Sequence, residues 1–103
     1  MARATKETVL KELGNFIRVN NMVSDRGNDI PNQFELRFDG GIVFQSYNSV
    51  IAVKLYNDNK VYLGDDWDYS RTTGKYRNKF LGVNKAEIVK GLTNGNFQHV
   101  EGL

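Results

Sequence analysis

The chain has 103 residues, of which 40% are hydrophobic and 25% are charged, and its formal net charge is +2. This length favours a single domain over residues 1–103, and the composition is typical of a soluble globular protein. The chain has no cysteine, which excludes disulfides, thiolate zinc sites and cysteine nucleophiles. Its apolar runs are too short to cross a membrane, and its N-terminus does not resemble a signal peptide. We therefore expect a cytoplasmic protein without a membrane partner.

Residues 5–19 have the pattern of an amphipathic helix. Thr5 is a candidate N-cap, and apolar residues recur at helical spacing from Val9 to Ile17. Gly14 interrupts this stripe and lowers helix stability by up to about 1 kcal/mol relative to alanine, and it leaves room for another backbone to come close. We expect the helix to pack on a sheet, with a partner-binding helix as the alternative. The polar residues 20–32 are predicted to form a connector.

From residue 33 the hydrophobic period changes to two, which is typical of strands. Phe34, Leu36 and Phe38 alternate with polar residues. Residues 39–41, Asp-Gly-Gly, favour a tight hairpin with positive φ angles. The pattern predicts an antiparallel meander of four to five strands within residues 33–69. The expected strands are 33–38, 42–47, 50–56, 60–63 and, as an optional fifth, 66–69.

Residues 72–94 are predicted to form two short helices. The first is capped by one of the hydroxyl residues at 70–73 and stops at Gly82. The second opens with a capping box of Asn84 and Glu87, and ends near Gly95. Residues 97–100 are expected to add a short extended tail to a sheet edge. Helices and strands that are segregated in this way indicate the α+β class.

The sequence shows no constellation for catalysis. His99 is the only histidine and lies near the end of the chain, where a surface role is expected rather than a general base or a metal ligand. The glycines lack the spacing of a phosphate-binding loop. We therefore expect a protein that is not an enzyme and that binds no cofactor and no metal.

The densest acidic group is formed by Asp65, Asp66 and Asp68. Three interpretations stay open: a solvated turn before a helix, an acidic patch that meets a basic partner, and a site for a hard cation. Trp67, the only tryptophan, lies within this group as either a core residue or an exposed interface anchor.

Basic and aromatic residues follow directly. Arg71, Lys75, Arg77 and Lys79 surround Tyr76, a pattern that is able to bind a phosphate backbone and stack a base. A solvated helix face, with Tyr76 in the core, is the alternative.

One segment resembles a family signature. Tyr69, Ser70, Thr72, Thr73 and Lys75, then Phe80 and Leu81, are similar to a Tyr-Ser-x-Thr-Thr-x-Lys-x4-Phe-Leu pattern in small uncharacterised proteins of phages and prophages of low-GC Gram-positive bacteria. Upstream, Phe44, Ser46, Tyr47, Asn48 and residues 50–52 resemble the same family. The resemblance covers roughly residues 34–81. It implies an origin in a mobile element, and hence the host cell cytoplasm, and it implies no activity or site.

Together these observations predict a non-enzymatic accessory protein of a phage or mobile element that binds and modulates a host or defence protein, for example as an anti-CRISPR-type inhibitor. The alternative is a nucleic-acid-binding accessory protein that uses Arg71, Lys75, Tyr76, Arg77 and Lys79. The open edges of a meander allow either a monomer or a homodimer. The predicted partner-binding residues are Asp65, Asp66, Trp67, Asp68, Arg71, Lys75 and Lys79.

Overall fold

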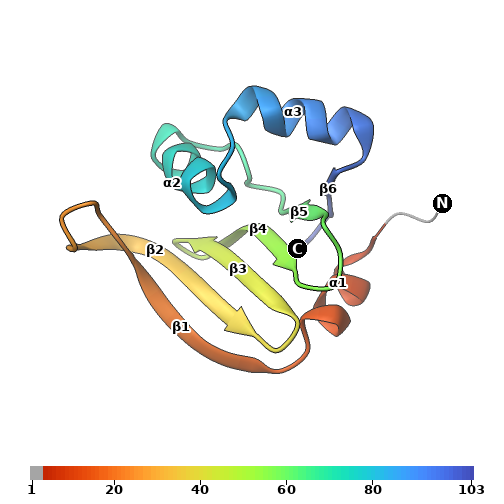
Figure 1. The fold of residues 1–103 in the computed structure, drawn as a ribbon, viewed down its shortest axis with the longest axis horizontal. Helices are drawn as coiled ribbons and strands as arrows, with labels where there is room; N and C mark the ends of the chain where they lie inside the picture. The colour runs from red at the N-terminus through yellow and green to blue at the C-terminus, as the bar shows by residue number, and fades with distance from the viewer. Residues whose placement is uncertain (1–3) are drawn as a thin grey trace.

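The computed structural model describes residues 4–103 and shows three helices and one six-stranded sheet (Figure 1). The strands lie in chain order, and all neighbours are antiparallel except the last pair, which is parallel. The predicted α+β class is confirmed. The elements are α1 (Lys6–Leu13), β1 (Phe16–Val23), β2 (Asp29–Phe38), β3 (Gly41–Ser46), β4 (Ser49–Leu55), β5 (Val61–Leu63), α2 (Arg71–Leu81), α3 (Lys85–Asn94) and β6 (Phe97–His99).

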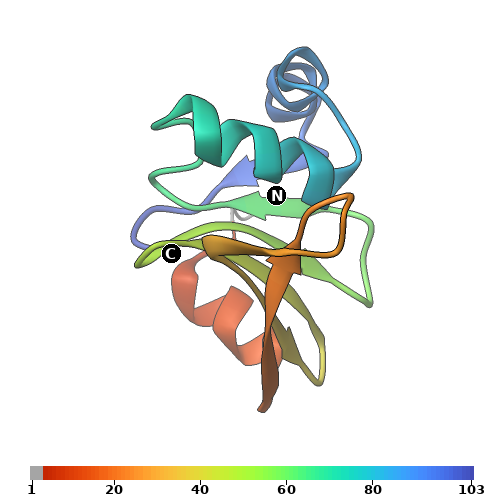
Figure 2. The same cartoon turned by 90° about the vertical axis from the view of Figure 1, so that its left-hand side faces the viewer.

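The sheet separates two hydrophobic clusters. Helices α2 and α3 lie on one face and α1 lies on the other, as the turned view shows (Figure 2). Phe44 is fully buried on the α2 face, while its neighbour Val43 belongs to the cluster that contains Val9 and Leu13 of α1. Adjacent residues of a strand point to opposite faces, so the central strands need apolar residues at successive positions. Full burial of a side chain such as that of Phe44 contributes about 1.5–3 kcal/mol.

The first helix is shorter than the predicted 5–19. It is capped by Thr5 as expected, but it ends at Leu13, and Gly14 has a φ of +71°. Half of the eight residues from Phe16 to Val23 are β-branched or aromatic, and this segment forms β1 against β2. Because the apolar stripe continued at helical spacing through Phe16 and Ile17, the sequence pattern did not reveal this change.

The predicted connector 20–32 is also wrong. It comprises the end of β1, a turn in which the Ser24 N–H donates to the Asn28 carbonyl at 2.8 Å, and the start of β2. The sheet therefore begins near residue 16 rather than 33. The optional strand at 66–69 is likewise not formed, because this segment is a turn. The sixth strand is instead β6, the predicted extended tail, which pairs with β5.

The hairpin glycines serve a purpose other than the one predicted. Neither Gly40 nor Gly41 has a positive φ. A Cβ atom at Gly40 would overlap the carbonyl oxygen of Glu12, at the end of α1. The close backbone approach expected beside Gly14 thus occurs at Gly40, and it lets α1 rest on the hairpin.

The C-terminal helices follow the sequence signals. Ser70 caps α2, and Asn84 with Glu87 forms the capping box of α3. Thr73, in the first turn of α2, shares a buried hydrogen bond of 2.9 Å with Ser46 at the end of β3. This contact fixes the start of α2 on the sheet.

We predict that Gly40→Ala lowers the free energy of unfolding by about 1–3 kcal/mol, because the new methyl group overlaps a backbone atom that cannot rotate away. Urea denaturation measures the change. Gly27→Asn is the matched control, since Gly27 has open space around it and asparagine tolerates its positive φ. An equal loss in both variants would contradict the close approach.

Candidate interaction surface

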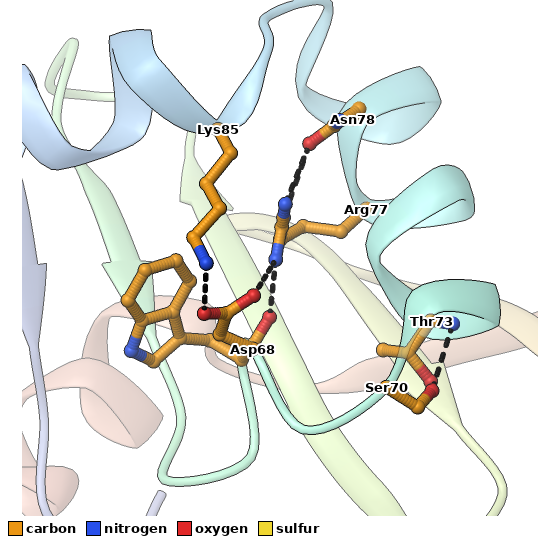
Figure 3. A network of polar contacts seen from close by, with 7 residues as sticks. Asp68, Ser70, Thr73, Arg77, Asn78 and Lys85 are labelled. Atoms are coloured by element: carbon orange, nitrogen blue, oxygen red, sulfur yellow. Dashed lines mark hydrogen bonds and ion pairs between the residues drawn. The ribbon is translucent and has the colours of Figure 1, made fainter.

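Arg77 lies at the centre of a polar network that joins α2 to the turn after β5 (Figure 3). Its Nη1 donates to the carbonyl oxygen of Trp67 at 2.8 Å and to Asp68 Oδ1 at 3.2 Å. Its Nε and Nη2 donate to Asn78 Oδ1 at 3.1 and 2.9 Å. The side chain is only 2% exposed. Arg77 is therefore a structural anchor, contrary to the prediction that it contacts nucleic acid.

Asp68 extends this network to α3. Lys85 Nζ lies 2.7 Å from Asp68 Oδ2, while Arg77 holds the other oxygen. The hydrogen bond from Lys85, with a further one from Arg77, holds the pKa of Asp68 below its usual range, although partial burial opposes the shift. One carboxylate thus links α2, α3 and the turn.

The other two predicted acidic residues also bind within the chain. Asp65 Oδ1 lies 2.7 Å from His99 Nε2, and its Oδ2 accepts the Gly102 N–H at 3.0 Å. These two hydrogen bonds, that from His99 first, lower the pKa of Asp65. Asp66 Oδ2 accepts the Ser49 hydroxyl at 2.7 Å. The three carboxylates hold the turn to β4, β6 and the helices, which explains their density without a partner.

The two aromatic residues of the predicted sites both contribute to the core. Trp67 is half-buried and packs against the cluster beneath α2, with the Arg77 guanidinium 5.4 Å from its ring centre. Tyr76 is half-buried against the same cluster. Neither ring is fully exposed, and both contribute to the packing beneath α2.

The exposed remainder of the predicted site is basic and lies on α2. Arg71 and Lys75 are exposed, and neither makes an ion pair with another residue of the described chain. Lys79 donates to the carbonyl oxygen of Val23 at 3.2 Å and to Asp25 Oδ1 at 3.3 Å. The structure thus brings the predicted residues into one region. Of its basic residues, Arg71, Lys75 and Lys79 are exposed, while the exposed carboxylates of the turn already accept hydrogen bonds within the chain.

The largest concentration of exposed apolar side chains lies elsewhere, on β1. This strand is one end of the sheet and follows the outer rim in Figure 1. Phe16, Ile17, Val19 and Val23 are 54%, 58%, 54% and 48% exposed. An edge strand with apolar side chains and an unpaired outer side is a template for another strand.

The register divides the side chains of β1 between the two faces of the sheet. Val19 lies opposite Leu36, on the α1 face, where Leu36 packs against the α1 cluster. Phe16 lies opposite Phe38, and their ring centres are 5.5 Å apart. The α1 face of this edge is therefore apolar. Its outer side chains are exposed because α1 covers only part of this face.

The α2 face of the same edge is basic. Arg18 lies opposite Arg37, Arg37 opposite Ile42, and Ile42 opposite Lys54, so that three cations share one row across four strands. Lys54 Nζ donates to the Phe80 carbonyl at 3.0 Å and lies over the Phe80 ring. None of the three makes an ion pair with another residue among 4–103. We call Arg18, Arg37 and Lys54 the basic row.

Sequence reasoning missed both features of β1. The helical spacing that continued past Gly14 assigned Phe16 and Ile17 to the first helix, and the polar composition of residues 20–32 indicated a connector. The available signal was the run Phe16–Val23, which combines a preceding glycine with β-branched and aromatic residues. The basic row needed the register of four strands, which the composition of the chain does not reveal.

Residues 4–103 lack two further features that would indicate a site of another kind. No described helix has the length and apolar character needed to span a membrane. No group of three or more histidine, cysteine, aspartate or glutamate side chains in this part of the chain is arranged to hold a metal ion.

Comparison with known proteins places residues 17–97 in a family of unknown function, DUF8033. This range contains nearly all of the sheet together with α2 and α3. No curated protein and no solved structure matches the chain.

We predict that Arg77→Ala lowers the free energy of unfolding by about 3 kcal/mol, because it opens a cavity and leaves the Trp67 carbonyl without its donor. Arg71→Ala is the control at an exposed position of the same helix, where a change below about 0.5 kcal/mol is expected. Urea denaturation of both variants checks the difference. Comparable losses would show that Arg77 is not the anchor.

The lowered pKa of Asp68 predicts acid sensitivity. A carboxyl group whose pKa is lowered by folding stabilises the fold at pH values above its ordinary pKa of about 3.8. This contribution is lost as the pH falls through the lowered pKa of the folded state. We expect the free energy of unfolding to fall between about pH 5 and about pH 2 less steeply in Asp68→Asn than in the natural chain, with Asp65 retaining part of the slope.

Denaturation in urea at several pH values measures these slopes. Asp29→Asn, at an exposed position without an ion pair in the described chain, is the control. Parallel curves for the natural chain and Asp68→Asn would refute the contribution of Asp68.

Proposed function

The chain belongs to DUF8033, a family of unknown function, and we propose that it is a non-enzymatic domain that binds a partner protein along the edge of β1. The observation that carries this proposal is the exposed apolar edge formed by β1. Main-chain hydrogen bonds to an added strand supply affinity in this mode of binding, and side chains on alternate faces supply specificity.

The shape of β1 supports a limited and specific contact rather than open-ended aggregation. Register shifts interrupt its pairing between Phe16 and Arg18 and again between Asn21 and Val23. Bulges and charged residues are the means by which natural edge strands avoid pairing with arbitrary chains. A regular segment of four residues, Arg18 to Asn21, lies between these shifts and is the part of the edge suited to an added strand.

The biological role predicted from the sequence stays a prediction. A phage or mobile-element protein that binds a host or defence protein, such as an anti-CRISPR-type inhibitor, requires a binding surface and no catalytic group. The edge of β1 suits that role better than the turn at Asp65–Asp68, whose carboxylates already bind within the chain.

The nucleic-acid alternative is weaker but stays testable. It loses Arg77 to the buried network and retains Arg71, Lys75 and Lys79 on α2. Binding through these lysine and arginine side chains would fall steeply with rising salt, because phosphate contacts release counterions.

We predict that a photo-crosslinking amino acid at position 19 captures a specific protein from a bacterial lysate treated with nuclease, whereas the same amino acid at position 89 does not. Val89 is the matched control because it is 48% exposed on α3, close to the 54% of Val19. Mass spectrometry identifies the captured protein.

Affinity measurements with that purified protein then test the surface. Val19→Lys is expected to weaken binding at least about tenfold, since it places a charge in an apolar contact, while Val89→Lys leaves binding unchanged. If the Val89 position captures the partner equally well, or if Arg71→Glu and Lys75→Glu weaken binding while Val19→Lys does not, the proposed surface is wrong.

A further inference from the structure

Two arginines at the outer end of the basic row lack a counter-charge. Arg18 of β1 and Arg37 of β2 lie directly opposite each other in the register. Like charges directly opposite in a sheet are destabilising, and an opposite charge in a neighbouring position is favourable. Neither guanidinium makes an ion pair within residues 4–103, and Arg37 Nε is buried without a hydrogen-bond partner. This pair therefore provides a place for an anion.

The neighbouring residues do not fill this place. Glu35 lies on the same face, two positions before Arg37, but it pairs with Asn20 and makes no ion pair in the described chain. Lys54, further along the row, adds positive charge. The open position is on the outer side of Arg18, because β1 is an edge strand of the sheet.

The geometry of strand addition determines what would occupy that position. A residue of an added strand that lies opposite Arg18 projects from the α2 face, next to the arginine pair. The adjacent residue of the same strand lies opposite Val19 and projects from the α1 face, which is apolar at this edge. Successive residues of the added strand therefore meet a basic surface on the α2 face and an apolar surface on the α1 face.

We propose that β1 recognises an extended protein segment that carries a carboxylate opposite Arg18 and an apolar side chain opposite Val19. The carboxylate accepts hydrogen bonds from the Arg18 guanidinium and offsets the charge of Arg37, while the apolar side chain covers Val19. This inference rests on the proposed function, because it specifies the chemistry of the strand that the edge binds.

Two other occupants fit less well. A second copy of β1 contains neither aspartate nor glutamate, so pairing of two β1 edges would add arginine or asparagine to the row instead of a carboxylate. A nucleic-acid phosphate satisfies Arg18 but leaves Ile17 and Val19, at 58% and 54% exposure, in contact with water. The combination of charge and apolar surface therefore favours an acidic protein strand.

The test uses three fluorescent peptides of about ten residues in which valine and threonine alternate, so that an extended peptide has a valine face and a threonine face. The three peptides differ only at one central threonine, which is replaced by Glu, Gln or Lys. Fluorescence polarisation with the full chain measures their affinities. We expect the Glu peptide to bind at least about tenfold tighter than the Lys peptide, with the Gln peptide between them. Arg18→Glu is expected to reverse this order, because it reverses the charge that meets the peptide.

Arg18→Glu also keeps the test independent of folding. The introduced carboxylate faces Arg37, so the midpoint of thermal unfolding is expected to stay the same or to rise. Val19→Lys should abolish binding of the Glu peptide, and Val89→Lys should not. These results together support the inference.

Three outcomes overturn it. If all three peptides bind equally well and Val19→Lys abolishes their binding, the acidic preference is refuted, while strand addition at β1 is retained. Binding of no peptide, or binding that ignores Val19→Lys, refutes the inference, and the crosslink from position 19 then decides separately whether β1 binds a protein. Displacement of the Glu peptide from the natural chain by an equal concentration of single-stranded oligonucleotide, together with direct oligonucleotide binding that Arg18→Glu abolishes, would identify phosphate as the anion instead.

Discussion

The alternation of side chains along the sheet is the constraint on which the rest of the structure depends. Val43 and Phe44 are neighbours in β3, yet one packs beneath α1 and the other beneath α2. A shift of one residue in any strand would exchange these faces and expose the core, so burial on both faces specifies the register. The same register carries Arg18 and Val19 outward to the edge, one on each face. The chemistry of the candidate interaction surface thus follows from the packing of the core.

The segment with the strongest sequence signature has a structural task. The turn after β5 holds three carboxylates, and each of them binds another element of the fold: β4 through Ser49, the C-terminal segment through His99, and α2 and α3 through Asp68. Charged and aromatic residues gathered on one turn look like a binding site in the sequence. In the folded chain their hydrogen bonds are directed inward, and the surface that lacks partners lies at the opposite end of the sheet.

How well the fold was predicted depended on the range of the interactions that determine each element. The caps of α2 and α3 are local, because Ser70 and Asn84 bond to backbone groups three residues away. The sequence offered Ser70 as one of the candidate caps of α2 and predicted Asn84 directly. The end of α1 depended on competition between helical spacing, which continues past Gly14, and β-pairing with β2. The strand signal of Phe16–Val23 was present in the local sequence, but the helical spacing outweighed it. The burial of Arg77 and the pairing of Arg18 with Arg37 arise only from contacts between distant segments. The class of the fold was therefore predictable, while the candidate surface was not.

We propose that a protein partner binds at β1 rather than at the turn and helix around Asp65–Lys79. Hydrogen–deuterium exchange of the natural chain, free and bound to a partner purified by tagged pull-down, distinguishes the two surfaces. Binding at β1 is expected to slow amide exchange across Phe16–Val23 and to leave residues 65–81 unchanged, because an added strand engages the outer backbone groups of β1. Protection confined to residues 65–81, with β1 unaffected, would contradict it.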